Sequence, residues 1–186
     1  MSEGAGPSSA YFFKSQVARY GNQDHHSNCR NIKLEYMALQ NAPDLTTRPP
    51  RSPRVRLGGF VLLPRILDKC RAVIAGTNGE FNYNCPSDQL FFDFTGVNPA
   101  ALKKQVQLGK GDGEILAWIK THSKHNRTDS EIMAWSAYCE GRTPGNIESR
   151  EFFHETHRNI APRREDIITW FDLLDLDDYA SFGGKP

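Results

Sequence analysis

The sequence predicts an all-α fold: a single compact domain of about six helices, with a proline- and arginine-rich extended N-terminal arm and one short extended element. Three observations lead to this prediction. Apolar residues recur at helical spacing after residue 59, glycine and proline punctuate that pattern, and strand-like alternation is confined to one short stretch. A chain of 186 residues is long enough for one well-buried core and too short for two.

Residues 1–43 differ in composition from the rest of the chain. They are polar and rich in Gly, Ser and Asn, and their few apolar clusters show no sustained periodicity. We therefore expect residues 1–43 to be a disordered extension and residues 44–186 to form the helical domain. Met37 lies directly before the change in composition, so we expect residues 1–36 to be dispensable for folding.

An extended arm is predicted for residues 46–56. Pro49, Pro50 and Pro53 disfavour a helix there, because proline lacks a backbone N–H and keeps the residue before it out of the helical region. Three prolines so close together favour the polyproline II conformation instead.

The first helix is predicted directly after the arm. Its apolar residues fall on one helical face: Leu63, Ile66, Leu67, Cys70, Val73 and Ile74. Pro64 suits its first turn, and Gly76 suits its C-terminal end. The following stretch, Glu80–Cys85, alternates apolar and polar residues, which predicts the short extended element.

Further helices follow, each with its own start or stop signal. Thr128 and Glu131 form a capping-box pattern, and Gly141 ends the helix that they begin. The predicted ranges run from Pro86 to Thr95, from the cap Asn98 to Gly109, from the cap Asp112 onward, from Thr128 to Gly141, from Asn146 to Asn159 and from Arg163 to Asp178. Apolar residues occupy most sides of the last helix, so we expect it to be central.

Composition and charge exclude several classes of function. The formal net charge is +1, which gives no general attraction to nucleic acid or to an anionic membrane. No run approaches the roughly 18 apolar residues of a membrane span, and the N-terminus lacks the pattern of a secretory signal. We therefore expect a cytoplasmic protein with four reduced cysteines. The absence of a CxxC pair or nucleotide fingerprint predicts no cofactor and no metal.

Two long strings of the sequence carry a family resemblance. They are DLTTRPPRSPRVRLGGFVLLPRILDKCRAVIAGTNGEFNYNCPSDQLFFDFTGV and ITWFDLLDLDDYASFGG. With them, the chain from about residue 44 to its end resembles a bacterial family catalogued as domain of unknown function 5069. The resemblance implies a compact bacterial domain that begins near the arm. It brings with it no activity, no cofactor and no site residue.

The arm is the first candidate for a functional site. It carries four arginines within nine residues: Arg48, Arg51, Arg54 and Arg56. Guanidinium groups bind phosphates and carboxylates in a bidentate manner, so a small anionic ligand held by Arg54 and Arg56 is one hypothesis. Nucleic acid is a weaker one, because no aromatic residues for base stacking are interleaved with the arginines.

A third hypothesis for the arm keeps its charges within the molecule, and we favour it. The last predicted helix carries an acidic tail of four aspartates: Asp172, Asp175, Asp177 and Asp178. The C-terminal end of a helix is unfavourable for uncompensated negative charge, so these carboxylates require cations nearby. The arginines of the arm are the simplest choice.

The stretch Glu80–Gln89 is the second candidate, because it gathers polar and aromatic residues between two helices. Cys85 directly precedes Pro86, at a position where a helix N-terminus favours a thiolate. Tyr83 and Asp88 are near in sequence and could orient a ligand or transfer a proton. No histidine that could act as a base lies nearby, so we favour a structural Cys85 over a catalytic one. Ligand binding by Tyr83, Cys85 and Asp88 is the functional hypothesis that we retain.

Two other patterns are assigned to ordinary structure. His122 and His125, like His154 and His157, are three residues apart and lack the HExxH spacing of a zinc site, so surface roles are favoured. The glycine-rich stretch 109–113 lacks the spacing of a phosphate loop, and we interpret it as a turn between two helices.

Two functions from different classes fit these patterns. The favoured one is a small-molecule-binding protein, with a small anion as one ligand, or an enzyme of unknown reaction; its pocket would use Tyr83, Cys85 and Asp88 with an arm arginine. The alternative is a protein-interaction module without catalytic chemistry, and nucleic-acid binding through the arm ranks below both. No pattern identifies a catalytic residue or an oligomeric state, and we predict neither.

Overall fold

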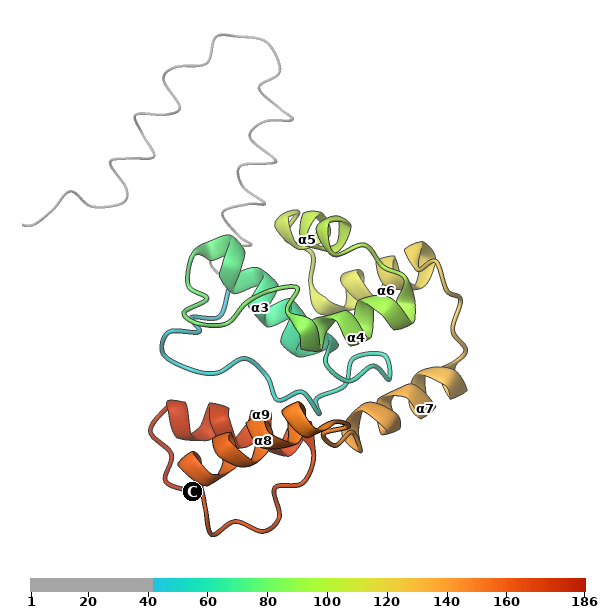
Figure 1. Cartoon of the computed structure of the whole chain (residues 1–186). Helices are drawn as coiled ribbons and strands as arrows, with labels where there is room; N and C mark the ends of the chain where they lie inside the picture. The colour runs from blue at the N-terminus through green and yellow to red at the C-terminus, as the bar shows by residue number, and fades with distance from the viewer. Residues whose placement is uncertain (1–41) are drawn as a thin grey trace, which may run out of the picture. The chain divides into compact units, whose positions relative to one another are not determined.

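The computed structural model describes residues 42–186, which form seven α-helices (Figure 1). These are α3 (Leu63–Ala75), α4 (Pro86–Thr95), α5 (Pro99–Gln107), α6 (Asp112–His122), α7 (Asp129–Glu140), α8 (Ile147–Ile160) and α9 (Trp170–Ser181). Residues 42–186 contain no strand, and an isolated antiparallel bridge joins Leu57 to Phe60. The all-α prediction is confirmed. The predicted extension lies outside the described residues except for its last two positions.

Local capping chemistry explains why several helices begin and end where the sequence predicted. Helix α4 spans the predicted residues, with Cys85 as its extended N-cap and Gly96 as its C-cap at φ 68°, a left-handed conformation that suits glycine. At the start of α7, the Thr128 hydroxyl accepts a hydrogen bond from the Glu131 N–H at 3.2 Å, and the Glu131 carboxylate accepts one from the Thr128 N–H at 2.8 Å. This reciprocal pairing is the predicted capping box.

The last helix begins later than predicted, at Trp170 rather than Arg163. The Thr169 hydroxyl accepts a hydrogen bond from the Asp172 N–H at 3.2 Å, and the Asp172 carboxylate accepts one from the Thr169 N–H at 2.7 Å. A capping box at these two residues fixes the start of the helix, and apolar periodicity alone did not locate it. Asp112 is also misassigned as a cap, because Gly111 is the N-cap and Asp112 is the first residue of α6.

The predicted short extended element is wrong. Glu80–Cys85 forms turns: the Phe81 N–H donates to the Asn78 carbonyl at 2.9 Å, and Asn84 has a positive φ of 65°. Alternation of apolar and polar residues needs a partner strand to become a sheet, and the described chain offers none.

The central helix is α3, not the last helix as predicted. Almost every residue of α3 from Leu63 to Ala72 is buried, whereas α9 leaves Tyr179 55% exposed. The main core joins α3 to α4, α5 and α6 through apolar side chains that include Leu63, Ile66, Leu67, Phe91, Leu102, Ile115 and Ile119. A smaller cluster forms where α8 and α9 lie side by side, from Phe153, Ala161, Ile167, Leu173 and Leu176 (Figure 1).

The arm is folded onto the domain, between α3 and α9. It is not one continuous extended segment, because the Val55 N–H donates to the Ser52 carbonyl at 3.1 Å and closes a turn. Pro50 and Pro53 are buried, and the Pro53 carbonyl accepts a hydrogen bond from the Leu62 N–H at 2.9 Å. Among residues 42–186, every helix is too short or too polar to cross a lipid bilayer.

Candidate functional site

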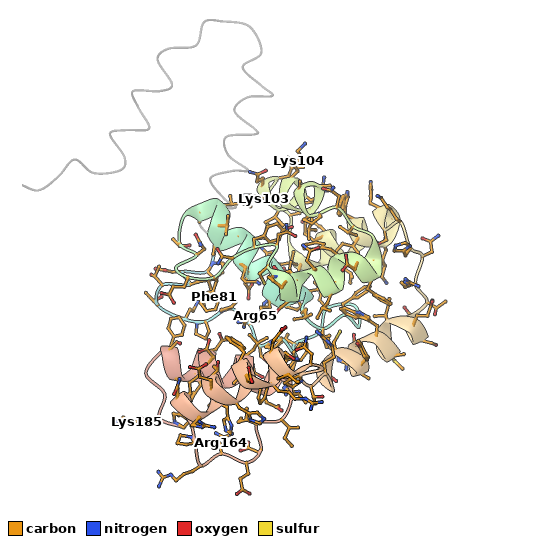
Figure 2. All side chains as sticks on the ribbon, in the orientation of Figure 1. Arg65, Phe81, Lys103, Lys104, Arg164 and Lys185 are labelled. Atoms are coloured by element: carbon orange, nitrogen blue, oxygen red, sulfur yellow. The ribbon has the colours of Figure 1, made fainter. Side chains whose placement is uncertain are left out.

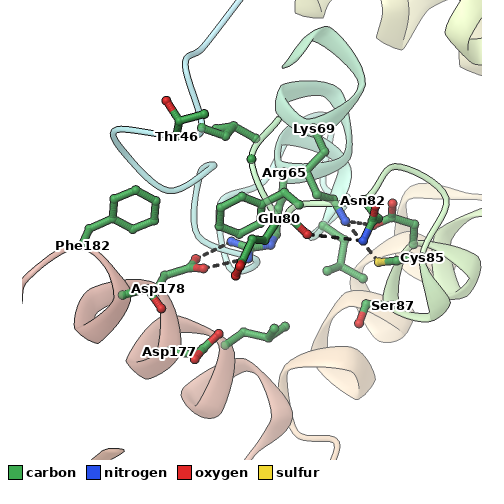
Figure 3. A pocket seen from close by; sticks show the side chains of 17 residues that line it. Thr46, Arg65, Lys69, Glu80, Asn82, Cys85, Ser87, Asp177, Asp178 and Phe182 are labelled. Carbon is green, nitrogen blue, oxygen red and sulfur yellow. Dashed lines mark hydrogen bonds and ion pairs between the residues drawn. The ribbon is translucent and has the colours of Figure 1, made fainter. Parts of the chain in front are cut away.

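A cavity of about 590 Å³ opens between α3, the turns that precede α4, and α9 (Figure 3). Its wall includes the polar side chains Arg65, Lys69, Glu80, Asn82, Cys85, Ser87, Asp88, Asp177, Asp178 and Ser181, together with the rings of Phe81 and Phe182. This volume lies within the range of about 300–1,000 Å³ that is usual for small-molecule sites. The cavity is therefore large enough for a metabolite-sized ligand.

One end of the cavity is formed by a buried ion pair between α3 and α9. Two guanidinium nitrogens of Arg65 donate to the two carboxylate oxygens of Asp178, at 2.6 and 3.0 Å. The side chains are only 6% and 8% exposed. The guanidinium also lies over the Phe81 ring, 5.6 Å from its centre. In Figure 2, Arg65 and Phe81 lie between α3 and the α8–α9 pair, whereas Lys103 and Lys104 lie at the periphery.

The other end holds a second buried ion pair, which includes a cysteine. The Lys69 ammonium donates to Asp88 Oδ1 at 2.6 Å and to Cys85 Sγ at 3.2 Å. The side chains of Lys69 and Asp88 are 5% and 1% exposed. Asp88 Oδ2 accepts a second hydrogen bond from the Asn84 N–H at 2.8 Å. Because Lys69 follows Arg65 by four residues, one face of α3 brings both cations to the cavity.

Two residues have unusual backbone conformations, one in the cavity wall and one directly before a residue of that wall. Leu62, the N-cap of α3, and Asn84, which precedes Cys85, both have a φ of 65°. Asparagine tolerates a positive φ, but Leu62, with a ψ of −34°, lies outside the left-handed helical region and is strained by about 1–3 kcal/mol. Strain of this kind persists only where the surrounding structure holds it, and it is concentrated at functional sites.

The wall of the cavity is acidic overall. Arg65 and Lys69 face four carboxylates, those of Glu80, Asp88, Asp177 and Asp178. Burial, together with repulsion from Asp178 and Glu80, raises the pKa of the Asp177 carboxyl above its usual value, although Arg65 opposes this effect. The cations are already matched one to one by Asp178 and Asp88. The surplus charge is therefore negative.

Of the residues predicted to contact a ligand, Cys85 and Asp88 line the cavity and Tyr83 does not. The Tyr83 hydroxyl donates to the Pro99 carbonyl at 2.7 Å, and its ring packs edge-on against Phe92. Burial, reinforced by Cys70 and Asp88, raises the pKa of this phenol above its ordinary value. Tyr83 therefore packs against the core and does not line this cavity.

Arg54 and Arg56, the arm arginines predicted to bind a ligand, lie outside the cavity. Arg54 pairs with Asp172 and, through its Nε, with Asp175 at 3.3 Å. Arg56 pairs with Glu140 of α7 at 2.9 Å. The predicted pairing of the arm with the acidic tail is therefore confirmed for Arg54 and wrong for Arg56.

The rest of the acidic tail differs from the prediction as well. Asp178 is neutralised by Arg65 of α3, and Asp177 forms no ion pair with any residue between 42 and 186. Arg51 of the arm donates instead to Asp68 and Asp112, at 2.8 and 2.7 Å. The arm and the tail meet, but only in part.

Arg65 and Lys69 are site residues that the sequence did not predict. Both are flanked by apolar residues of α3, and both lie on a face that an amphipathic helix would expose to solvent. Their four-residue spacing was a signal that the two charges share one side of the helix. What it could not show is that α4 and α9 cover that side with carboxylates.

Within residues 42–186, His, Cys, Asp and Glu side chains nowhere form a group of three or more suited to hold a metal ion. A model of the family described as "Domain of unknown function (DUF5069)" matches residues 47–180, which is well over half of the chain. No curated protein matches the chain.

Proposed function

Because the chain belongs to the family described as Domain of unknown function (DUF5069), and that description names no activity, we propose a function from the cavity itself: the domain binds a small polar molecule between α3, α4 and α9. The observation that carries this proposal is the pair of buried salt bridges, Arg65–Asp178 and Lys69–Asp88, in the wall of a 590 Å³ cavity.

These salt bridges have a high energetic cost if stability is their only role. Removing four charged groups from water costs several kcal/mol per ion, and apolar side chains of similar volume often give an equally or more stable protein. Here the charged groups border an open space, where their remaining hydrogen-bonding capacity can be used. The Lys69 ammonium has three N–H groups, of which Asp88 and Cys85 occupy two.

The charge of the wall supports a neutral or positively charged ligand. A small anion was expected from the arginines of the arm, but Arg51, Arg54 and Arg56 each pair with carboxylates. An anion in the cavity would also meet the carboxylates of Glu80 and Asp177, which form no ion pair with any residue between 42 and 186. The same ion pairs weigh against binding of nucleic acid or of a protein partner through the arm. The three free thiols among residues 42–186 and the family resemblance support the further proposal of a bacterial, cytoplasmic protein.

A cavity-filling substitution tests the proposal. Ser87 is the second residue of α4 and lines the cavity, whereas Ser130 is the second residue of α7 and is exposed outside it. Ser87→Trp should therefore abolish binding, and Ser130→Trp, at the matched helical position, should leave it intact. The measurement is ligand-observed NMR with a set of neutral and cationic polar fragments.

The expected result is a group of fragments that bind the wild type and Ser130→Trp but not Ser87→Trp. Circular dichroism melts of all three proteins establish that each is folded at the temperature of the measurement. If fragments bind all three proteins equally, or bind none of them, the proposed binding function is wrong.

A further inference from the structure

The cavity brings together a thiol, an ammonium group and the start of a helix. Cys85 is the N-cap of α4, a helix of ten residues, and its Sγ lies 3.2 Å from the Lys69 ammonium. Figure 3 shows both side chains directed toward the same space. We propose that Cys85 is the nucleophile of this cavity and that Lys69 stabilises the negative charge that Sγ carries before it attacks an electrophilic carbonyl carbon. This inference rests on the proposed small-molecule-binding function.

Comparison of the three described cysteines supports the choice of Cys85. Cys70 and Cys139 are buried, and burial raises the pKa of their thiols to about 12 and about 11. Neither lines the cavity. Cys85 is half-buried and lies in the cavity wall. It is therefore the thiol, among residues 42–186, that a small molecule in the cavity can reach.

Lys69 is held in place by its other contact. Its ammonium is bound to Asp88 at 2.6 Å, and Asp88 is itself fixed by the Asn84 N–H at 2.8 Å. A buried lysine held in this way already has one N–H directed at Sγ. It does not lose the side-chain conformational entropy that an exposed lysine would lose on making the same contact. Cysteine nucleophiles are activated by neighbouring lysine, arginine or protonated histidine, and by helix N-termini. Lys69 supplies the positive charge that a protonated histidine would supply beside such a thiol, and it does not act as a base.

The start of α4 offers a second stabilising group. The N–H groups of Asp88 and Gln89 both donate to the Cys85 carbonyl, at 2.9 and 3.2 Å. The N–H of Ser87 makes no hydrogen bond to any residue between 42 and 186. It is one of the unpaired donors of a helix N-terminus, and it lies two residues from the attacking sulfur. A free N–H at this position can donate to the oxygen of a carbonyl under attack.

These groups suit transfer of an acyl group from an ester or a thioester. The Sγ–C bond forms as the bond from the carbonyl carbon to the alcohol oxygen or thiol sulfur breaks. The proton that Sγ gives up goes to the departing alcohol or thiol, so the products are an acyl-cysteine and a free alcohol or thiol. No oxidant, reductant or metal takes part.

Two probes test the nucleophile in the full chain. A Cys29→Ser background removes the one cysteine outside the described residues. With iodoacetamide near neutral pH, Cys85 should be alkylated at least about tenfold faster than Cys70 or Cys139, as followed by peptide mass spectrometry. With p-nitrophenyl acetate, about one equivalent of p-nitrophenolate should be released in a burst and an acetyl group should appear on Cys85. Cys85→Ala should remove the burst, and the control Cys139→Ala should retain it.

The role of Lys69 needs a variant that does not leave a lone buried charge. Lys69→Met alone would strand Asp88, so the test variant is Lys69→Met combined with Asp88→Asn, which removes both charges of the pair. Alkylation of Cys85 should slow by about tenfold or more, because a charge-assisted hydrogen bond to Sγ is lost. Lys69→Arg, which keeps a positive charge beside Sγ, should retain most of the wild-type rate of Cys85 alkylation.

The outcomes separate this inference from the binding function. If Cys85 reacts no faster than Cys70, or reacts only after denaturation, the nucleophile is wrong. If fragments nevertheless bind the wild type and not Ser87→Trp, the binding function stands without it. If Cys85 reacts rapidly in both the wild type and the Lys69→Met/Asp88→Asn variant, the assigned role of Lys69 is wrong. Failure of the fragment test and of the alkylation test together removes both proposals.

Discussion

The arm and helix α3 both place basic side chains against aspartates, but they do so at different depths. In the arm, the side chains of Arg54 and Asp175 remain 39% and 35% exposed, and their closest atoms are 3.3 Å apart. In α3, Arg65 and Asp178 are almost fully buried and form a two-point contact. The sequence showed the arm as four clustered arginines and gave α3 no special weight, although α3 supplies the cations of the cavity.

This difference shows that the depth of a charge, rather than its density in the sequence, decides what the charge does. Water and salt screen the partly exposed pairs of the arm, so each contributes little and can be exchanged. A buried pair depends on its partner, because an isolated charge in the protein interior is strongly unfavourable. Clustered arginines therefore tie the arm to the domain surface, and two isolated cations shape the candidate site.

The largest effect is expected when a buried pair is broken. Asp178→Ala leaves the Arg65 guanidinium buried without its carboxylate, and we expect a loss of about 3–5 kcal/mol in the free energy of unfolding. Urea denaturation followed by circular dichroism measures this loss. Asp177→Ala is the matched control, since Asp177 directly precedes Asp178 on the same helix and forms no ion pair with any residue between 42 and 186. Its effect should stay within about 0.5 kcal/mol. Equal effects of the two substitutions would contradict the contrast between buried and exposed charges.

A smaller effect is expected in the arm. A double-mutant cycle of Arg54→Ala and Asp175→Ala should show a favourable coupling of about 0.2–1 kcal/mol, because both side chains are more than a third exposed. High salt should reduce this coupling. Asp175 is a better cycle partner than Asp172, whose carboxylate also caps α9. Arg48→Ala, at an exposed arm residue, is the control and should show no coupling to Asp175. A coupling energy as large as that expected for the buried pairs would contradict the contrast between the arm and α3.

Local signals in the sequence were sufficient to predict the fold. Capping residues, N-terminal prolines and C-terminal glycines act within one or two turns, so Pro86 and Gly96 bounded α4 correctly. Errors occurred where tertiary contacts decide the outcome. Residues 42–186 offer Glu80–Cys85 no partner strand, and α9 faces solvent on one side because α3 occupies the centre.

The candidate site was predicted only in part, for a related reason. Cys85 and Asp88 could be identified because they occupy a helix start, which is a local feature. Arg65 pairs with Asp178 of α9, which lies far along the chain from α3. Lys69 pairs with Asp88 of α4, which is separated from α3 by a turn. Tyr83 was predicted to contact a ligand because it is close to Cys85 in sequence. The chain turns at Asn84, and the ring of Tyr83 packs against the core instead. The spacing of residues along the sequence does not show in which direction their side chains point.

The smallest effect concerns the surplus acid of the cavity. Burial and the neighbouring carboxylates raise the pKa of Asp177 above its ordinary value of 3.8, so the folded state retains its proton to a higher pH than the unfolded chain does. Between the pKa of the unfolded chain and that of the folded state, the folded state binds more protons than the unfolded chain. The free energy of unfolding therefore falls as the pH rises through the pKa of the folded state. Asp177→Asn lacks this loss. We therefore expect the variant to be slightly more stable than the wild type near neutral pH and equal to it below the ordinary pKa.

Asp112 provides the control of opposite sign in the same titration. Its burial disfavours ionisation, but the hydrogen bond from Arg51 and the ion pair with Arg71 outweigh this effect and lower its pKa, so its contribution is present near neutral pH and is lost on acidification. The free energy of unfolding of wild type, Asp177→Asn and Asp112→Asn, measured by urea denaturation across the acidic range, should show the two variants diverging from the wild type in opposite directions as the pH rises. If Asp177→Asn is the less stable protein near neutral pH, the carboxylate is stabilised by the cavity wall. The surplus negative charge that favours a neutral or cationic ligand would then be absent.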